Sequence, residues 1–167
     1  MSQGFHPKPR MSFPSALAVG AAGLQEVMEA ELAEPYTAQQ IQERLPLHLL
    51  PGLTLCSVEI LPPGTPKARV RSTTWEVPLP PARLAETASR IGRLTAPPGG
   101  PARDGAVAPP PHGGVEEISL CQGVLHMRLR AGPGRVPGPR DVLAALGLDD
   151  LEPGAHPLTR TIVELEP

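Results

Sequence analysis

The segment STTWEVPLPPARLAETASRIGR (Ser72–Arg93) combines two periodicities in one short stretch of chain. Its first part, STTWEVPL, is rich in β-branched and aromatic residues and predicts a β-strand. Two prolines follow, and a proline pair is common at the start of a helix. The next apolar side chains then recur on one helical face, at Leu84, Ala88 and Ile91. The segment therefore predicts a strand followed directly by a helix.

Two more strands, a second helix and a last strand are predicted after this segment. GVEEISLCQG (Gly114–Gly123) and VLHMRLRAG (Val124–Gly132) meet at a Gln-Gly turn, which is typical of a hairpin. RDVLAALG (Arg140–Gly147) is a short helix that begins after Pro139 and ends with a glycine suited to its C-terminus. TRTIVELE (Thr159–Glu166) is the last strand. The order strand-helix-strand-strand-helix-strand is the split βαβ, or ferredoxin-like, arrangement.

The first half of the chain predicts a similar order without its beginning. SFPSALAVG (Ser12–Gly20) predicts a strand, and Leu24–Glu34 predicts a second strand after a glycine turn, although its composition also suits a helix. Tyr36–Leu49 predicts a helix that begins with a Thr-Ala-Gln-Gln capping box and ends near a proline. Leu53–Leu61 alternates as a strand. The order is again that of a split βαβ unit, but its opening strand and helix are missing.

The sequence thus predicts an α+β protein with tandem ferredoxin-like units. The first unit, residues 1–66, is incomplete, and the second covers residues 72–167. Residues 95–114 form a Pro/Gly/Ala-rich loop within the second unit, which is too poor in large apolar residues to bury a core.

Composition disfavours several classes of function. The net charge is −2, so no overall basic field attracts nucleic acid or an anionic membrane. Two Phe, one Tyr and one Trp are too few for an RNA reader built on stacked rings. Cys56 and Cys121 cannot form a disulfide framework or a four-thiolate metal site by themselves. No apolar run is long enough for a membrane helix, and the N-terminus lacks the apolar region of a signal peptide, so a cytoplasmic protein is expected.

Several strings resemble the radical-SAM-linked protein family, a bacterial domain family of unassigned activity. They are SQGFHPKPRMSFPSALAVG, MEAELAEP and LLPGLTL in the first half, and GPGRVPGPRDVLAALGLDD and LTRTIVELE in the second. The resemblance implies an accessory role beside a radical S-adenosylmethionine protein, which often carries a cobalamin-binding domain. Since the three-cysteine motif of radical SAM enzymes is absent from this sequence, the iron–sulfur cluster and S-adenosylmethionine are expected only on that partner. No cofactor is expected in this chain.

The same resemblance bears on the predicted fold and on the ligand. Family members carry a strand and a helix ahead of the SQGFHP string, and these are the two elements that the first half lacks. The family's basic central segment is replaced here by the loop at residues 95–114. The genes that surround the family, and a fold-level similarity to CRISPR RNA-processing proteins, imply RNA as a ligand.

The strongest local pattern is a basic, proline-stiffened segment at the N-terminus. Pro7 and Pro9 keep the backbone extended, so alternate side chains share one face. Arginine can grip a phosphate with two N–H groups and lysine can attract it as a point charge. Lysines and prolines on an edge strand also serve simply to prevent edge-to-edge pairing. The residues predicted to contact an anionic ligand in this segment are Gln3, His6, Lys8, Arg10 and Ser12.

A second basic row is predicted on the strand Val124–Gly132, where His126, Arg128 and Arg130 share one parity. Arg160, on the last strand, matches an arginine of the family pattern and is predicted to support the same ligand or to be an ordinary strand-end cation. A metal site is not expected, because the histidines have no ligand spacing.

The expected function is therefore that of a non-catalytic module which presents an anionic ligand, such as RNA, to a radical SAM partner. A metal-independent RNA-processing enzyme with His6 as general base is one alternative. A truncated, inactive remnant is the other.

Overall fold

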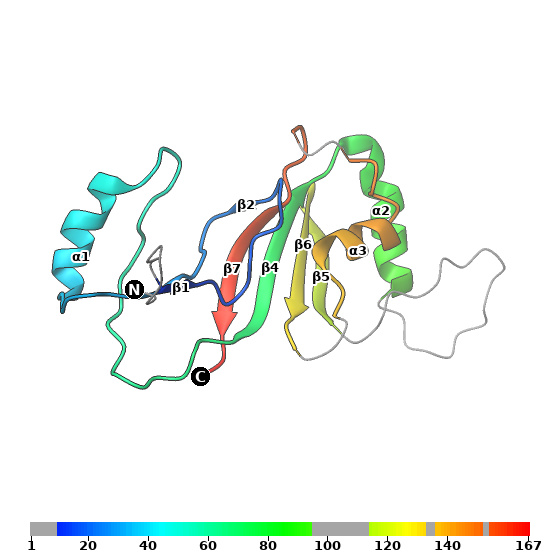
Figure 1. Cartoon of the computed structure of the whole chain (residues 1–167). Helices are drawn as coiled ribbons and strands as arrows, with labels where there is room; N and C mark the ends of the chain where they lie inside the picture. The colour runs from blue at the N-terminus through cyan, green and yellow to red at the C-terminus, as the bar shows by residue number, and fades with distance from the viewer. Residues whose placement is uncertain (1–9, 95–113, 133–135, 152–153) are drawn as a thin grey trace, which may run out of the picture. The chain divides into compact units, whose positions relative to one another are not determined.

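A computed structural model of the chain describes two compact units (Figure 1). The first unit contains residues 10–14 and 27–68, and the second contains Ser15–Glu26 and Arg69–Pro167. Residues 15–26 thus belong to the second unit, although they lie within the expected first unit. The described residues are 10–94, 114–132, 136–151 and 154–167.

The second unit is built on an antiparallel sheet of four strands in the order β7-β4-β6-β5. The strands are β4 (Val70–Pro78), β5 (Val115–Cys121), β6 (Val124–Arg130) and β7 (Thr159–Leu165). Of these four strands, β4 comes first in the chain and lies in the centre of the sheet, between β6 and β7. With helix α2 after β4 and helix α3 after β6, this is the split βαβ order predicted for the second half.

One face of this sheet packs against the two helices, α2 (Pro81–Leu94) and α3 (Pro139–Ala145) (Figure 1). Residues of alternate parity on β4 and β6 point into the core, as expected for a sheet with one buried face. Leu84 and Ile91 of α2 pack against that core from the predicted helical face. The buried apolar residues are Trp75, Val77, Leu79, Leu125, Met127, Leu129, Val142, Leu143, Leu146, Leu148 and Leu158.

Local signals in the sequence place the turns of the second unit as predicted. Gln122 (φ 50°) and Gly123 (φ 80°) both take the left-handed conformation, which gives the tight turn between β5 and β6. At the end of α3, Gly147 (φ 63°) donates to the carbonyl of Ala144, and Leu148 donates to the carbonyl of Leu143. These two bonds form a Schellman motif, which stops the helix at the predicted glycine.

A fifth strand joins the sheet from an unexpected part of the chain. β2 (Ala22–Gly23) pairs in parallel with β7, and Leu24 N–H donates to the carbonyl of Arg160. The prediction of a continuous strand over Ser12–Gly20 is wrong: its residues from Phe13 onward lie in bends, turns and irregular structure. Helix formation over Leu24–Glu34 is also excluded, since a strand occupies part of that range.

The first unit contains one small sheet and one helix among its described residues. β1 (Arg10–Ser12) pairs antiparallel with β3 (Glu29–Glu31). α1 (Ala38–Arg44) has the predicted capping box, in which Thr37 and Gln40 bond each other's backbone N–H groups. It then tightens into the 3₁₀-helix η1 (Leu45–His48), because the proline at position 46 cannot continue an α-helix.

The predicted strand over Leu53–Leu61 is wrong, since the described chain there has no regular structure. The α+β class is confirmed, but the tandem arrangement is not, because the described part of the first unit forms only the two-stranded sheet. The predicted loop at 95–114 lies outside the described residues, except for Gly114.

Candidate functional site

The predicted ligand-binding residues fall on three separate places in the fold. Arg10 and Ser12 lie on β1, His126, Arg128 and Arg130 lie on β6, and Arg160 lies on β7. Gln3, His6 and Lys8 lie outside the described residues.

On β1, the side chains of Arg10 and Ser12 share one face of the small sheet, as predicted from alternation. Each is opposed by a carboxylate of β3: Arg10 contacts Glu31 at 3.0 Å, and Ser12 Oγ donates to Glu29 Oε2 at 2.9 Å. Glu29 also accepts the N–H of Ala68 at 2.8 Å. The Ala68 N–H and, after it, the Ser12 hydroxyl lower the pKa of Glu29. Bound phosphate would have to displace these carboxylates.

The row on β6 is also present, and it lies on the face of the sheet opposite the core. His126, Arg128 and Arg130 project from alternate positions beside the polar side chains of β4 and β5. His126 Nδ1 lies 3.4 Å from Glu76, and Arg128 contacts both Glu116 and Glu164. Each cationic or potentially cationic group of this row therefore lies beside a carboxylate.

Glu116 of β5 pairs with both arginines of this row. Arg130 Nε donates to its Oε1 at 2.9 Å, and Arg128 Nε donates to its Oε2 at 3.0 Å. The hydrogen bond from Arg130 is the main cause that lowers the pKa of Glu116. Desolvation opposes it in part, and the hydrogen bond from Arg128 lowers the pKa further. The expected basic face is thus a network of ion pairs, in which three glutamates face two arginines and one histidine.

Arg160 is buried, with 1% of its surface exposed, and it connects segment 15–26 to the sheet. Its Nε donates to Glu26 Oε1 at 2.8 Å, its Nη1 donates to Ser15 Oγ at 2.9 Å, and its Nη2 donates to Ser15 O and to Glu26 Oε2. The guanidinium also stacks over the Trp75 ring at 5.3 Å from the centroid. Arg160 therefore links segment 15–26 to the sheet inside the second unit. Few of its N–H donors remain for an external anion.

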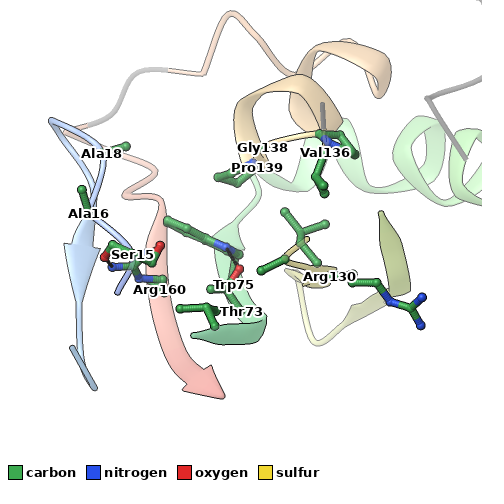
Figure 2. Close-up of a pocket in the computed structure, with 14 residues that line it drawn as sticks. Ser15, Ala16, Ala18, Thr73, Trp75, Arg130, Val136, Gly138, Pro139 and Arg160 are labelled. Carbon is green, nitrogen blue, oxygen red and sulfur yellow. Dashed lines mark hydrogen bonds between the residues drawn. The ribbon is translucent and has the colours of Figure 1, made fainter. Parts of the chain in front are cut away.

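A pocket of about 240 Å³ opens beside Arg160, between segment 15–18 and the loop that precedes α3. Figure 2 shows the Trp75 ring and the Arg160–Ser15 contact on one side and Val136, Gly138 and Pro139 on the other. The Arg130 side chain points away from it (Figure 2). With mostly apolar walls and an arginine that is already paired, the pocket suits a small apolar group better than a phosphate.

Sequence reasoning did not identify the apolar face of the first unit. Met11 and Ala30 lie on the side of the β1–β3 pair opposite Arg10, and the alternation continues at Phe13, Met28 and Leu32. The exposed fractions of the four large side chains are 54% for Met11, 57% for Phe13, 45% for Met28 and 48% for Leu32. Alternation along Leu24–Glu34 already placed Met28, Ala30 and Leu32 together, but it could not show that nothing in the described chain covers them fully.

Two further searches cover only the residues that the structure describes. No group of three His, Cys, Asp or Glu side chains there has the geometry to hold a metal ion. None of the helices there combines the length and apolar character that crossing a bilayer needs.

Comparison with known proteins identifies the family but no relative of established activity. Neither a curated protein nor a solved structure matches the chain significantly. A family model does match, over residues 1–98, which is more than half of the chain. The protein therefore belongs to the family described as "Uncharacterized protein conserved in bacteria (DUF2344)".

Proposed function

We propose that this protein is an accessory module which binds a radical SAM protein through its first unit. The observation that carries the proposal is the difference in burial between the units. Described residues of the second unit form a buried apolar core, whereas no described residue of the first unit is buried. Several large apolar side chains of the first unit are more than half exposed, among them Leu47, Leu50 and Leu53. Exposed apolar side chains that form a contiguous patch mark a protein–protein contact surface, and in this proposal those of the first unit form one.

The identity of the partner rests on the resemblance of the SQGFHP string and its neighbours to radical-SAM-linked proteins. In this proposal the iron–sulfur cluster, S-adenosylmethionine and any cobalamin belong to the partner.

The test is association of the purified full chain with a radical SAM protein from the same organism, measured by calorimetry and size-exclusion chromatography. We expect a stable complex with a dissociation constant in the micromolar range or tighter and a negative heat-capacity change, since apolar surface is buried. Absence of association at protein concentrations of about 100 μM, a hundred times a micromolar constant, would contradict the proposal.

A second candidate function, RNA binding, is favoured by one observation. His126, Arg128 and Arg130 form a continuous row on an open sheet face, which is the geometry that a phosphate backbone can follow. The carboxylates that pair with them oppose such binding, so any RNA would have to exchange with Glu76, Glu116 and Glu164.

Binding of labelled tRNA at low salt tests this second candidate. If the row contacts phosphates, replacing Arg128 and Arg130 by alanine removes about two phosphate contacts. The slope of log K against log salt concentration then becomes less steep by ~1.4–1.8. The same measurement on Lys8→Ala with Arg10→Ala tests the N-terminal segment. Binding that neither pair of substitutions changes would exclude both rows as the RNA contact.

A further inference from the structure

The pocket beside Arg160 continues the core face of the second unit's sheet. Its floor includes Thr73 and Trp75 of β4. These two residues pair in register with Leu129 and Met127 of β6, which are buried in the core. Directly opposite residues of paired strands share one face, so the floor of the pocket lies on the side of the sheet that packs against the helices. The pocket is therefore an accessible extension of the apolar core, and it lies within one unit of the chain.

Two short segments from distant parts of the sequence form the walls of this pocket. Ala18 belongs to the wall contributed by residues 15–18, and Val136 and Pro139 belong to the opposite one (Figure 2). Both walls are mainly apolar, and the volume is about 240 Å³. Since an apolar cavity of about 150 Å³ is enough to hold benzene, this pocket has room for one six-membered ring with a short substituent.

Two hydroxyl groups of the lining can donate a hydrogen bond to a ligand. Thr73 Oγ1 accepts the indole N–H of Trp75 at 2.9 Å, and Ser15 Oγ accepts from Arg160 Nη1 at 2.9 Å. In both contacts the hydroxyl oxygen is the acceptor, so its proton remains available. Neither proton has an acceptor among the residues that the structure describes. An oxygen acceptor on a bound molecule would supply one.

The charges around the pocket disfavour an ionic ligand. Glu26 already pairs with the guanidinium of Arg160, and Arg130 pairs with Glu116 while its side chain points away from the pocket (Figure 2). No carboxylate is among the described residues that line it. A bound anion or cation would therefore lose its hydration without gaining a counter-ion, which costs much more than the transfer of a neutral polar group.

We propose that this pocket binds a small uncharged molecule that combines an apolar ring with a hydrogen-bond acceptor. The ring lies between residues 15–18 and residues 136–139, against the indole of Trp75. The acceptor oxygen receives the hydroxyl proton of Thr73 or Ser15. The site belongs to the second unit, so it does not depend on the contact surface proposed for the first.

The experiment titrates the full chain with benzyl alcohol, with its charged counterparts benzoate and benzylamine, and with inorganic phosphate. Binding is followed by the indole N–H signal in a proton–nitrogen NMR spectrum, since Trp75 is the single tryptophan and its N–H contacts Thr73. Benzyl alcohol should shift this signal with a dissociation constant of about 5 mM or lower. Both charged rings should bind at least about tenfold more weakly, and phosphate should cause no shift.

Two outcomes of the titration contradict the proposal. Absence of a saturable shift with benzyl alcohol at about 50 mM, ten times the expected constant, overturns the site itself. Any of the ions binding within about tenfold of benzyl alcohol overturns the assignment to an uncharged ligand, because the pocket would then supply a counter-ion.

A substitution and a direct measurement locate the bound ring. Ala18→Leu should weaken binding of benzyl alcohol by at least about tenfold, because the larger side chain occupies part of the pocket. The matched control is Ala85→Leu, at an exposed alanine of α2 that does not line the pocket, which should leave affinity unchanged. In the unsubstituted chain, nuclear Overhauser effects from the ring protons should reach both Trp75 and Val136. Equal affinity of Ala18→Leu, or Overhauser effects to neither residue, overturns the site.

Discussion

The two units of this protein carry similar sequence patterns and reach very different degrees of burial. In the second unit, alternating strands and a helix with one apolar face form a core that contains eleven buried apolar residues among those that the structure describes. In the first unit, the same kinds of pattern leave every described side chain at least partly exposed. The difference teaches that alternation specifies which face of a strand is apolar. Burial depends on whether other elements of the chain cover that face.

The polar residues follow the same division. Arg160 and Glu26 form an ion pair inside the second unit, whereas Arg10 and Glu31 form one on the surface of the first, with about 60% of each side chain exposed. The loss of one partner should therefore destabilise the fold more at the buried pair than at the exposed pair, because solvent screens the exposed charges most.

Truncation of one leucine in each unit should give the largest difference in the free energy of unfolding between the two units. Leu125 is fully buried, so Leu125→Ala should lower the free energy of unfolding by about 3–4 kcal/mol. Leu53 in the first unit is 60% exposed, and Leu53→Ala should cost less than about 0.5 kcal/mol. Urea unfolding followed by backbone circular dichroism, which reports both units, measures both losses. Equal losses would show that the first unit is packed in solution.

Breaking the buried ion pair should have the next largest effect. Glu26→Gln leaves Arg160 buried with a weakened partner, and we expect a loss of about 2–3 kcal/mol, less than for fully buried pairs because Glu26 is partly exposed. The control, Glu31→Gln, removes the exposed pair and should cost less than about 1 kcal/mol. The same urea experiment compares them. A small loss for Glu26→Gln would mean that segment 15–26 detaches readily from the sheet.

Two glycines with positive φ allow the stability contribution of the Arg90 contact to be separated from that of backbone strain. Gly147 (φ 63°) lies against the Arg90 guanidinium, which donates to Leu146 O at 2.7 Å, whereas Gly52 (φ 90°) has open space around it. Gly147→Ala should cost about 2 kcal/mol, from left-handed strain and the displaced hydrogen bond. Gly52→Ala should cost about 1 kcal/mol, from strain alone. The thermal midpoint of each variant measures the difference, and equal shifts would show that Arg90 moves aside freely.

The elements that could be predicted from sequence are those with strong local signals. The capping box at Thr37, the Gln122–Gly123 turn and the Gly147 helix stop each depend on residues within a few positions of one another. The predictions that failed depend on partners far along the chain. Leu53–Leu61 has a strand pattern but pairs with no strand in the described part of the chain, and β2 forms through its pairing with β7.

The candidate site divides in the same way. Alternation correctly placed Arg128 and Arg130 on one face, because side-chain parity is a local property of a strand. It could not reveal that Glu116 and Glu164, from two other strands, neutralise them. The partners of Arg160 lie even further away in the sequence, since most of the chain separates Glu26 from Arg160. A charge row read from one strand therefore overestimates basicity whenever neighbouring strands carry acids at the same register.

Acid should weaken the second unit gradually, and Glu116→Gln should remove part of that effect. Arg130 and Arg128 hold the pKa of Glu116 below the ordinary carboxyl value of about 4.3, so the ion network stabilises the fold above that pH. This stabilisation is lost as the pH falls through the lowered value. Unfolding of wild type and Glu116→Gln should therefore converge between about pH 5 and pH 3, with wild type more stable at pH 7.

The matching experiment on the first unit uses Glu29, whose pKa is also lowered, first by the Ala68 N–H and then by Ser12. Because Glu29 belongs to a unit without a core, Glu29→Gln should leave the Trp75 transition unchanged at every pH. Its effect should appear instead in the exchange rate of the Ala68 amide, which loses its carboxylate acceptor. If Glu29→Gln shifts the Trp75 transition as Glu116→Gln does, the two units unfold as one cooperative body, and the contrast between them is one of exposure alone.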